Sequence, residues 1–325
     1  MHSNKSVVIW LLSGCFLIFI MVLVGGITRL TDSGLSMSTW SLIGGAPPLN
    51  LKEWMVAFET YKQTPEGQVN KHYSLSDFKY IFFWEYLHRM IGRFLGLVFI
   101  IPFIYFLIKK RLSKKLIFQC SMLLLLGGLQ GVIGWWMVKS GLVDKPDVSH
   151  YRLAIHLTTA FLTCSYTLWV ALPLILPGLR KGNKALLKKL SLLFVLIITQ
   201  IIYGAFVAGL KAGKIYNTWP KMGGHWIPES VFLDIGANYQ FIHRTLAIIV
   251  VFLTFYIWIK YKNSTFSKLE NNVLRLLPII VTIQFFLGVI TLVMGVPIVP
   301  AVLHQILAFL LLLTLVLNLF LFKKN

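Results

Sequence analysis

The segment EYLHRMIGR occupies residues 85–93 and leads directly into an apolar run at 94–108. It places a carboxylate, a histidine and two arginines where the chain would enter the hydrocarbon of a membrane. Ionisable groups at that depth are costly, so they indicate a functional site. Glu85 and His88 are three residues apart and therefore share one face of a helix. Gly92 continues that face one turn further and leaves bare backbone against which a flat ligand could lie.

The rest of the chain has the composition of an integral membrane protein. It has 325 residues, of which 57% are hydrophobic, and a mean hydropathy of +0.76. We predict an all-α polytopic fold with eight transmembrane helices, at about 7–27, 82–108, 116–138, 153–176, 190–210, 241–259, 273–295 and 301–322. The first run lacks a small-residue cleavage site and leads into further spans, which favours a retained helix over a signal peptide.

The net charge of +20 is distributed in a way that indicates membrane orientation and not nucleic-acid binding. Lysines and arginines cluster at 109–115, 180–189, 260–268 and 323–324, whereas every acidic residue except Glu270 lies on the other side of the predicted spans. The positive-inside rule therefore predicts that both termini are cytoplasmic. The basic surface would attract anionic membrane lipid, and we expect no nucleic-acid partner.

Cysteine placement restricts the covalent chemistry that the chain can support. Cys15, Cys120 and Cys164 all fall inside predicted spans, and none lies in an outer connection where the compartment would permit a disulfide. No CxxC or CxxCH segment occurs. The sequence therefore gives no support for covalent haem attachment or for a zinc ribbon.

An internal repeat divides the predicted spans into two sets of four. Matching residues in the first and third outside connections are Gly34, Trp40, Gly44 and Gly45, and Gly213, Trp219, Gly223 and Gly224. Matching residues in the second and fourth spans of the two sets are Leu87-His88-Arg89 with Ile242-His243-Arg244, and Ala154-Ile155-His156-Leu157 with Val302-Leu303-His304-Gln305. We expect two tandem, pseudo-symmetric four-helix bundles, an N-terminal half at 1–178 and a C-terminal half at 179–325, related by an axis along the membrane normal.

The four histidines of this repeat lie near the outer ends of even-numbered spans: His88, His156, His243 and His304. Two imidazoles that face each other across a helical bundle can ligate a haem iron from both sides. The residue four positions after each histidine is small: Gly92, Ala160, Ala247 or Ala308. Small residues are also common at ordinary membrane helix contacts, where a single histidine can be satisfied by a neighbouring helix. The fourfold recurrence favours ligation of a metal or cofactor.

Four arginines lie near these histidines and are candidate cofactor-binding residues: Arg89, Arg93, Arg152 and Arg244. A guanidinium can pair with a haem propionate through two parallel hydrogen bonds in a partly dry site. The alternative is that these long side chains extend to the membrane interface.

The two halves differ at one informative position. Glu85 lies three residues before His88, whereas Gln240 lies three residues before His243. We interpret this difference as a division of labour, because only the half with a carboxylate can perform proton chemistry beside its cofactor. The alternative is that Glu85 pairs with an arginine and orders the neighbouring connection.

Together these residues resemble the haem A synthase family over essentially the whole chain. The resemblance rests on the duplicated spans, the segment GGITRLTDSGLSM at 25–37, the Glu85-x-x-His88 motif and the partner histidines. It implies oxidation of the C8 methyl group of haem O to a formyl group, through hydroxylated intermediates, to give haem A for cytochrome oxidase. It also implies that His243 and His304 hold a haem b. By the same resemblance, His88 and His156 flank the substrate haem, with Glu85 as the essential acid.

The resemblance also implies partners and a location. These are haem O synthase, cytochrome oxidase assembly factors, an unidentified electron acceptor, a possible homo-oligomer, and the bacterial cytoplasmic (inner) membrane with the haem sites near its outer face. Some members carry a cysteine pair in the first outside connection. This chain has none there, so a mechanism that needs the pair cannot operate here. The chain looks closer to the branch shared by many Gram-negative bacteria and mitochondria.

Two other functions remain open from the residues alone. A di-haem b-type protein that passes electrons to a quinone would use all four histidines but would give Glu85 and the long connection at 28–81 no special role. A transporter with duplicated halves would need no paired histidines, and the scarcity of broken helices weighs against it. Extraction and identification of the bound haems would distinguish the three functions.

The predicted orientation can be tested with introduced cysteines. A cysteine at Ser113 should resist an impermeant thiol reagent in intact cells, because the basic connection around it is expected to be cytoplasmic. A cysteine at Ser74 should react, because residues 28–81 are expected outside. The reverse labelling pattern would overturn the orientation and the placement of the site.

Overall fold

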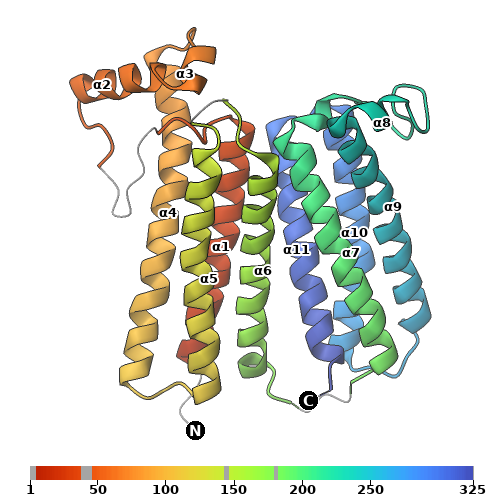
Figure 1. Ribbon diagram of the computed structural model, residues 1–325. Helices are drawn as coiled ribbons and strands as arrows, with labels where there is room; N and C mark the ends of the chain where they lie inside the picture. Colours follow the sequence, from red (N-terminus) through yellow and green to blue (C-terminus); the bar gives the residue numbers. More distant parts are fainter. Residues whose placement is uncertain (1–4, 38–45, 143–145, 179–181, 325) are drawn as a thin grey trace. The chain divides into compact units, whose positions relative to one another are not determined.

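The computed structural model describes residues 5–37, 46–142, 146–178 and 182–324, which are almost entirely helical (Figure 1). Eight of the described helices are long and apolar enough to cross a membrane. They are α1 (Lys5–Leu30), α4 (Leu75–Ile108), α5 (Lys114–Lys139), α6 (His150–Ile175), α7 (Lys184–Gly209), α9 (Ile235–Tyr261), α10 (Lys268–Val293) and α11 (Ile298–Phe322). Each overlaps one predicted span, so the predicted fold class, an all-α integral membrane protein, is confirmed.

The connections at 31–74 and 210–234 contain short helices that hydropathy does not reveal. They are α2 (Leu51–Lys62), α3 (Pro65–Val69), η1 (Ala212–Lys214) and α8 (Ser230–Leu233). α4 also begins seven residues before its predicted start at 82, because Ser74 and Asp77 form a capping box. In that box Asp77 Oδ2 accepts from the Ser74 backbone N–H at 2.9 Å. The first turns of α4 are too polar for a hydropathy window and were therefore outside the predicted span.

The described chain divides into two compact units, residues 13–156 and residues 157–324 together with 5–12. This division follows packing contacts and falls inside α6, whereas the sequence repeat divides the chain between 178 and 179. The tandem halves therefore stay a prediction. Trp40, Gly44 and Gly45 of the repeat lie outside the described residues.

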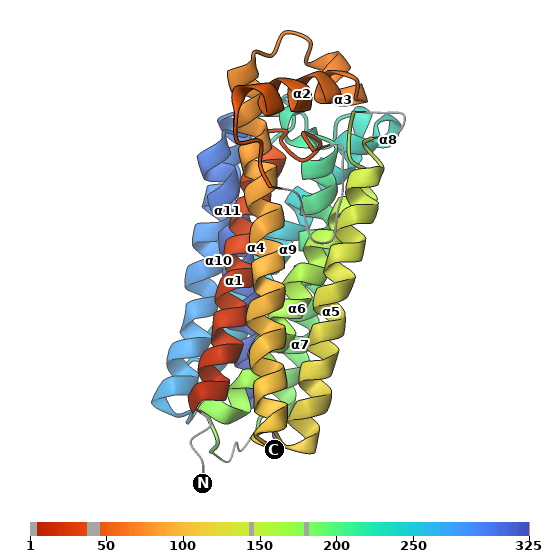
Figure 2. The same ribbon diagram turned by 90° about the vertical axis from the view of Figure 1, so that its left-hand side faces the viewer.

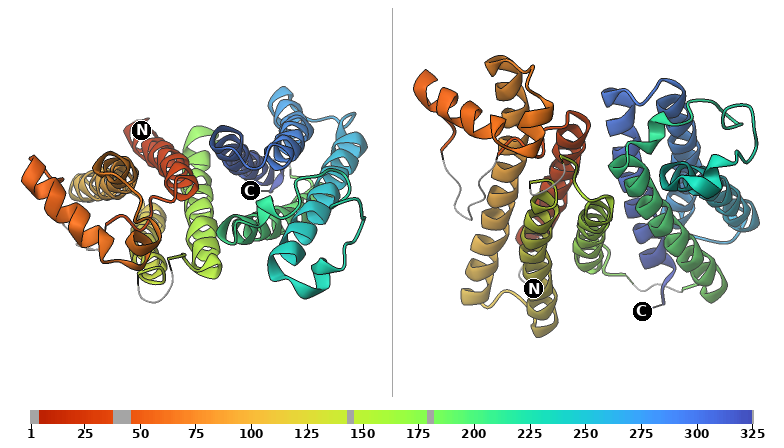
Figure 3. Two further views of the ribbon diagram at one scale, coloured as in Figure 1. Left: turned by 90° about the horizontal axis from the view of Figure 1, so that it is seen from above. Right: turned by 45° about the horizontal axis from the view of Figure 1, so that its top comes forward.

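In residues 157–324, α7, α9, α10 and α11 form a bundle in which each helix contacts two neighbours (Figure 3). The buried positions of α7 recur every three or four residues, as at Leu186, Leu190 and Leu193. Polar contacts also cross the bundle, because the buried Asn318 of α11 donates to the Val273 carbonyl of α10 at 3.1 Å. Such side-chain bonds between helices add specificity to apolar packing in a membrane protein.

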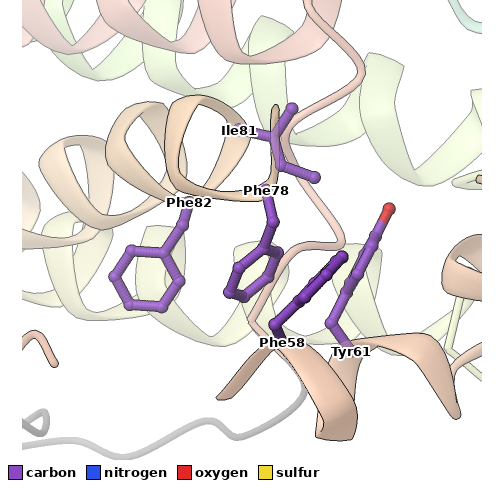
Figure 4. Close-up of a cluster of buried hydrophobic side chains, with 5 residues drawn as sticks. All are labelled: Phe58, Tyr61, Phe78, Ile81 and Phe82. Carbon is purple, nitrogen blue, oxygen red and sulfur yellow. The ribbon is translucent and has the colours of Figure 1, made fainter. Parts of the chain in front are cut away.

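In residues 13–156, α2 and α3 lie beside the first turns of α4 (Figure 2). Five buried residues, four of them aromatic, form the aromatic cluster that joins α2 to α4: Phe58, Tyr61, Phe78, Ile81 and Phe82 (Figure 4). The Phe78 ring lies at the centre, with its centroid 5.3 Å from that of Phe58 and 5.1 Å from that of Tyr61. Aromatic pairs at such separations stabilise beyond their buried area, so α4 carries the first outside connection on its extended end.

The Tyr61 phenol is a polar group within this apolar cluster. Burial raises the pKa of Tyr61 above its ordinary value, although a hydrogen bond from Asn70 works in the opposite direction. Asn70 Nδ2 donates to the phenol oxygen at 3.0 Å. The phenol is therefore a neutral structural group that ties the residue after α3 back to α2.

Candidate functional site

Each of the four predicted ligand histidines lies against a glycine of the preceding spanning helix. The pairs are Gly25 with His88, Gly134 with His156, Gly204 with His243, and Gly288 with His304. A Cβ atom on these glycines would lie 3.1, 3.2, 2.9 and 2.7 Å, in that order, from the nearest ring atom. A side chain there would push the imidazole away. The glycines therefore create the space in which each ring sits.

His243 of α9 and His304 of α11 come together within residues 157–324. Their ring centroids are 6.5 Å apart and their planes make an angle of 79°. Two imidazoles that share one metal ion at metal–nitrogen distances of about 2.0 Å have centroids about 6 Å apart. The separation therefore fits two axial ligands of one iron. The described residues hold no group of three or more His, Cys, Asp or Glu placed for a metal ion, and paired histidines suit an iron whose other ligands come from a porphyrin.

Gln200 of α7 contacts His243 at both ring nitrogens. Its backbone carbonyl lies 3.2 Å from His243 Nδ1, and its side-chain Nε2 lies 3.4 Å from His243 Nε2. The same amide donates to the His243 carbonyl at 3.0 Å, so its nitrogen, and not its oxygen, faces the histidine. An amide N–H can only donate, which makes Nε2 the acceptor and places the ring proton on Nδ1. In this tautomer the Nε2 lone pair accepts from the Gln200 amide, so a metal bound at Nε2 would replace that hydrogen bond.

Gln284 of α10 repeats part of this arrangement at His304. Its Nε2 lies 3.3 Å from His304 Nε2. His304 Nδ1 and the side-chain oxygens of Gln200 and Gln284 are buried without a hydrogen-bond partner in the described structure. Buried polar atoms are normally paired, so this cluster of unpaired atoms marks a place built for a further polar or coordinating group.

Sequence reasoning missed both glutamines. The pattern that could have found them is a glutamine four residues before the glycine that contacts the ring, at Gln200 with Gly204 and at Gln284 with Gly288. Polar residues of spanning helices that lie one turn from a functional position are candidates for the same site.

His88 of α4 and His156 of α6 form the second pair, within residues 13–156. Each ring lies against a glycine of the preceding spanning helix, Gly25 for His88 and Gly134 for His156. Gly92, one turn after His88, lies opposite Met21 of α1, whose Cε is 3.4 Å from the place of a Cβ on that glycine. The predicted small residue after His88 is therefore in contact with a flexible thioether, which adapts readily to the shape of its neighbours.

Glu85 lies one turn before this pair and is buried, with 3% of its surface exposed. Its Oε1 accepts from Arg89 Nη2 at 2.5 Å, and its Oε2 accepts from the Ser36 hydroxyl at 2.7 Å and from the Met37 backbone N–H at 2.9 Å. Arg89 also donates to the Met37 carbonyl at 3.4 Å. A carboxylate has about four acceptor sites, and the donors of these described residues occupy three of them. The acid thus anchors the connection after α1 to α4.

The same place in the other half is neutral. Gln240 Nε2 donates to the Tyr216 carbonyl at 3.0 Å, and the repeat that pairs Gly34 with Gly213 also pairs Met37 with Tyr216. Glu85 and Gln240 therefore hold equivalent loop residues. Glu85 accepts a hydrogen bond from Met37, whereas Gln240 donates one to Tyr216. Only the acid brings a charge to its site.

Arg244 carries the loop contacts of the second half without an acidic partner. Its Nη2 donates to the carbonyls of Thr218 and Pro220 at 2.7 and 3.0 Å, and its guanidinium lies 5.2 Å from the centre of the Trp219 ring. Its Nη1 is buried without a partner among the described residues. An unpaired buried guanidinium nitrogen suits an anionic group such as a propionate.

The other two candidate arginines have contacts outside the histidine pairs. Arg93 Nη1 lies 3.4 Å from the Met90 sulfur on the exposed side of α4. Arg152 Nη1 donates to the Trp136 carbonyl at 2.7 Å and stacks over the Trp136 ring at 4.4 Å. These contacts resemble those of arginines at a membrane interface, which was the alternative to propionate binding.

The fold and these contacts define a class: a polytopic α-helical membrane protein with two pairs of neighbouring histidines in its spanning helices. The family model for cytochrome oxidase assembly proteins matches residues 8–316. The haem A synthase of Flavobacterium psychrophilum is 52% identical over 100% of both chains. The haem A synthase of Flavobacterium johnsoniae is 50% identical over 95% of this chain and 96% of its own length. The haem A synthase of Nitrosospira multiformis is 44% identical over 93% of this chain and 89% of its own length. The chain belongs to the haem A synthase family, which confirms the resemblance found in its sequence.

The role of the ring-contacting glycines can be tested by a single methyl group. Gly288→Ala should destabilise the protein by about 1–3 kcal/mol, because overpacking at the His304 ring forces the helices or the ring to shift. Gly96→Ala is the matched control, since a Cβ there meets nothing within 4 Å. Thermal unfolding of the purified variants in detergent measures the difference. Equal midpoints for both variants would show that the α10–α11 contact does not depend on the glycine.

Proposed function

We propose that this protein is a haem A synthase that oxidises the C8 methyl group of haem O to a formyl group. The observation that carries the proposal is full-length similarity to haem A synthases. Its site is compatible with this, because only one of two histidine pairs has a buried acid beside it. The protein would be an oxidoreductase with haem O as substrate and haem A as product. The formyl oxygen would come from water or dioxygen, and the electrons removed from the methyl group would pass to an acceptor that is not identified, with the protons released to solvent.

The C-terminal pair is the proposed cofactor site. His243 and His304 would hold a haem b as axial ligands, which is supported by their 6.5 Å ring separation and by the glycines that make room for both rings. When bound, haem b would supply one-electron redox chemistry. Arg244 would pair with a propionate through its unpaired Nη1. The residues of this half would bind and orient the haem, because none of the contacts described for His243 and His304 is to a carboxylate.

The N-terminal pair is the proposed catalytic site. His88 and His156 would bracket haem O, and Glu85 would stand one turn from His88 on the same helix. Loss of hydrogen or of an electron from a porphyrin methyl group leaves an electron-poor centre, which a nearby carboxylate stabilises. A carboxylate oxygen of Glu85 could instead receive a proton. Arg89 and Ser36 would fix the carboxylate in position for either role.

The structural role of Glu85 has its own support. A buried carboxylate that accepts from Arg89, Ser36 and Met37 already orders the connection after α1. Removing one partner of a buried ion pair leaves an uncompensated charge and destabilises the protein. A test of the catalytic role of Glu85 must therefore distinguish the loss of its carboxylate from disorder of the connection after α1.

The di-haem electron-transfer function is not favoured, because the full-length relatives are haem A synthases. Similarity to haem A synthases does not by itself give the location, orientation or partners of this protein, and these are further parts of the proposal. They are the bacterial inner membrane, cytoplasmic termini, haem sites near the outer face, contact with haem O synthase or assembly factors, and a homo-oligomer. The distribution of basic connections supports the orientation.

Analysis of the bound haems tests the cofactor assignment. The purified protein should contain one stoichiometric haem b and less than one equivalent of haem O or haem A. Replacing either His243 or His304 with alanine should abolish the low-spin b-type absorption, because an iron that loses one axial imidazole changes its spin state. Two permanent b haems would favour electron transfer, and an unchanged spectrum in both variants would overturn the ligand assignment.

The role of Glu85 is tested by a pair of variants. Glu85→Gln keeps the volume and matches Gln240, and it should fold, retain haem b and accumulate haem O, with haem A formation lowered about a hundredfold or more. Ser36→Ala removes one hydrogen bond from the carboxylate but keeps the acid, so it should retain most of the haem A formation. Haem A and haem O are measured by extraction and chromatography. Near-normal turnover of Glu85→Gln, or equal losses in both variants, would assign the acid to loop order.

A further inference from the structure

The turn between α10 and α11 differs in composition from the other connections between spanning helices, each of which carries a charged residue. Residues 276–322 contain no Asp, Glu, Lys or Arg, and they include most of α10 and all of α11. The turn itself reads Met-Gly-Val-Pro at 294–297. Connections that lie in water are normally polar. This turn therefore has the composition of a segment in apolar surroundings.

The lengths of the two helices place the turn within the thickness of a bilayer. Arg275 is the charged residue of α10 nearest to the turn, and Val293 ends the helix 18 residues later, which is about 27 Å along its axis. The hydrocarbon core is about 30 Å thick, and charged side chains stay at or beyond its edge. On α11, Ile298 and Lys323 are 25 residues apart, or about 38 Å, whereas a bilayer with its headgroups measures about 40–45 Å. Tilt shortens both distances, so the turn ends near the far edge of the hydrocarbon.

The backbone of the turn is compatible with this depth. The N–H groups of Met294, Gly295 and Val296 donate to carbonyls of α10 at 3.0, 3.0 and 2.8 Å. The last residue of the turn, Pro297, has no N–H. An unpaired backbone donor is costly in the apolar part of a membrane. No N–H group of residues 294–297 therefore requires water.

The side chains around the turn are exposed and apolar. Met294 is 62% exposed and Val299 is 68% exposed, and Val293 and Ile298 are exposed as well. An apolar surface of this kind marks a contact with a protein partner or with a membrane. The depth at which α10 and α11 end favours lipid as the occupant.

The first half has a polar connection at the corresponding place. The register that pairs His156 with His304 also pairs the connection after α5 with the turn after α10. Residues 140–149 include Asp144, Lys145 and Asp147, whereas residues 294–297 include no polar side chain. The repeat therefore accommodates either chemistry at this place, and the apolar turn is a property of the second half.

We propose that residues 293–299 are immersed in the bilayer, where Met294 and Val299 contact lipid. His304 follows Ile298, the first residue of α11, by six residues, so it lies about 9 Å along the helix from this lipid-covered end. A molecule that approaches the second histidine pair past the turn has to be soluble in lipid. The inference concerns the protein in its membrane and does not depend on the proposed function.

Fluorescent labels on introduced cysteines test this placement in the full chain, reconstituted into phosphatidylcholine vesicles. Cys15 is replaced with alanine in every variant, because it is partly exposed whereas Cys120 and Cys164 are fully buried. Bimane is attached in detergent to Met294→Cys or to Val299→Cys before reconstitution. Its quenching is measured with iodide on both sides of the membrane and, separately, with phosphatidylcholine that carries a nitroxide near its headgroup.

Two further positions serve as references for these measurements. Lys71→Cys lies in the exposed segment before α4 and is the aqueous reference. Phe252→Cys lies in the middle of α9, where the native side chain is exposed on a spanning helix, and is the lipid reference.

Bimane at positions 294 and 299 should lose about half or more of its fluorescence with the nitroxide lipid, because the label lies near the edge of the hydrocarbon. It should change little with iodide, and Lys71→Cys should show the reverse. Strong quenching by iodide would place the turn in water. Protection from both quenchers would show that protein covers it, which in a purified sample means a second copy of the chain. Either result would overturn the inference and would leave the proposed function untouched. The two positions are measured independently, so one remains informative if the other variant fails to fold.

Discussion

Contact between an imidazole ring and a glycine backbone is the constraint on which both histidine pairs depend. In the absence of water, helices in a membrane associate through close packing, and small residues permit the closest approach. Here the space left by each missing side chain is filled by a ring of the next spanning helix, at Cβ distances between 2.7 and 3.2 Å. The histidines are therefore placed by helix–helix packing and not by loops, which gives a metal site the rigidity that its geometry requires.

The two sites share this scaffold and differ in charge. Glu85 and Arg89 form a buried ion pair that holds the connection after α1, whereas Gln240 and Arg244 hold the equivalent connection through backbone carbonyls. Gln240 adds no charge to the second half, but the buried Arg244 guanidinium has no acidic partner among the described residues. A buried carboxylate requires compensating donors, and the first half supplies them.

The outer connections are more than linkers between spans. The aromatic cluster around Phe78 fixes α2 on the extended end of α4, which is the helix that carries both Glu85 and His88. In the second half, Arg244 directly follows His243 and draws its loop over the same end of α9. Each site thus has a cover tied to a ligand helix.

The sequence by itself determined the eight spans, the histidines repeated in its two halves, and the acid three residues before His88. Apolar length defines a spanning helix without reference to its neighbours, and ionisable residues are conspicuous in hydrocarbon. Tertiary structure alone decided which glycine meets which ring, that Gln200 contacts both nitrogens of His243, and that Arg152 contacts Trp136. It also revealed α3, and α2, whose packing depends on Phe78 of a distant helix. The physical reason is that spanning helices are apolar on all sides, so their sequence does not tell which face turns towards a partner. That choice is made only when the helices pack.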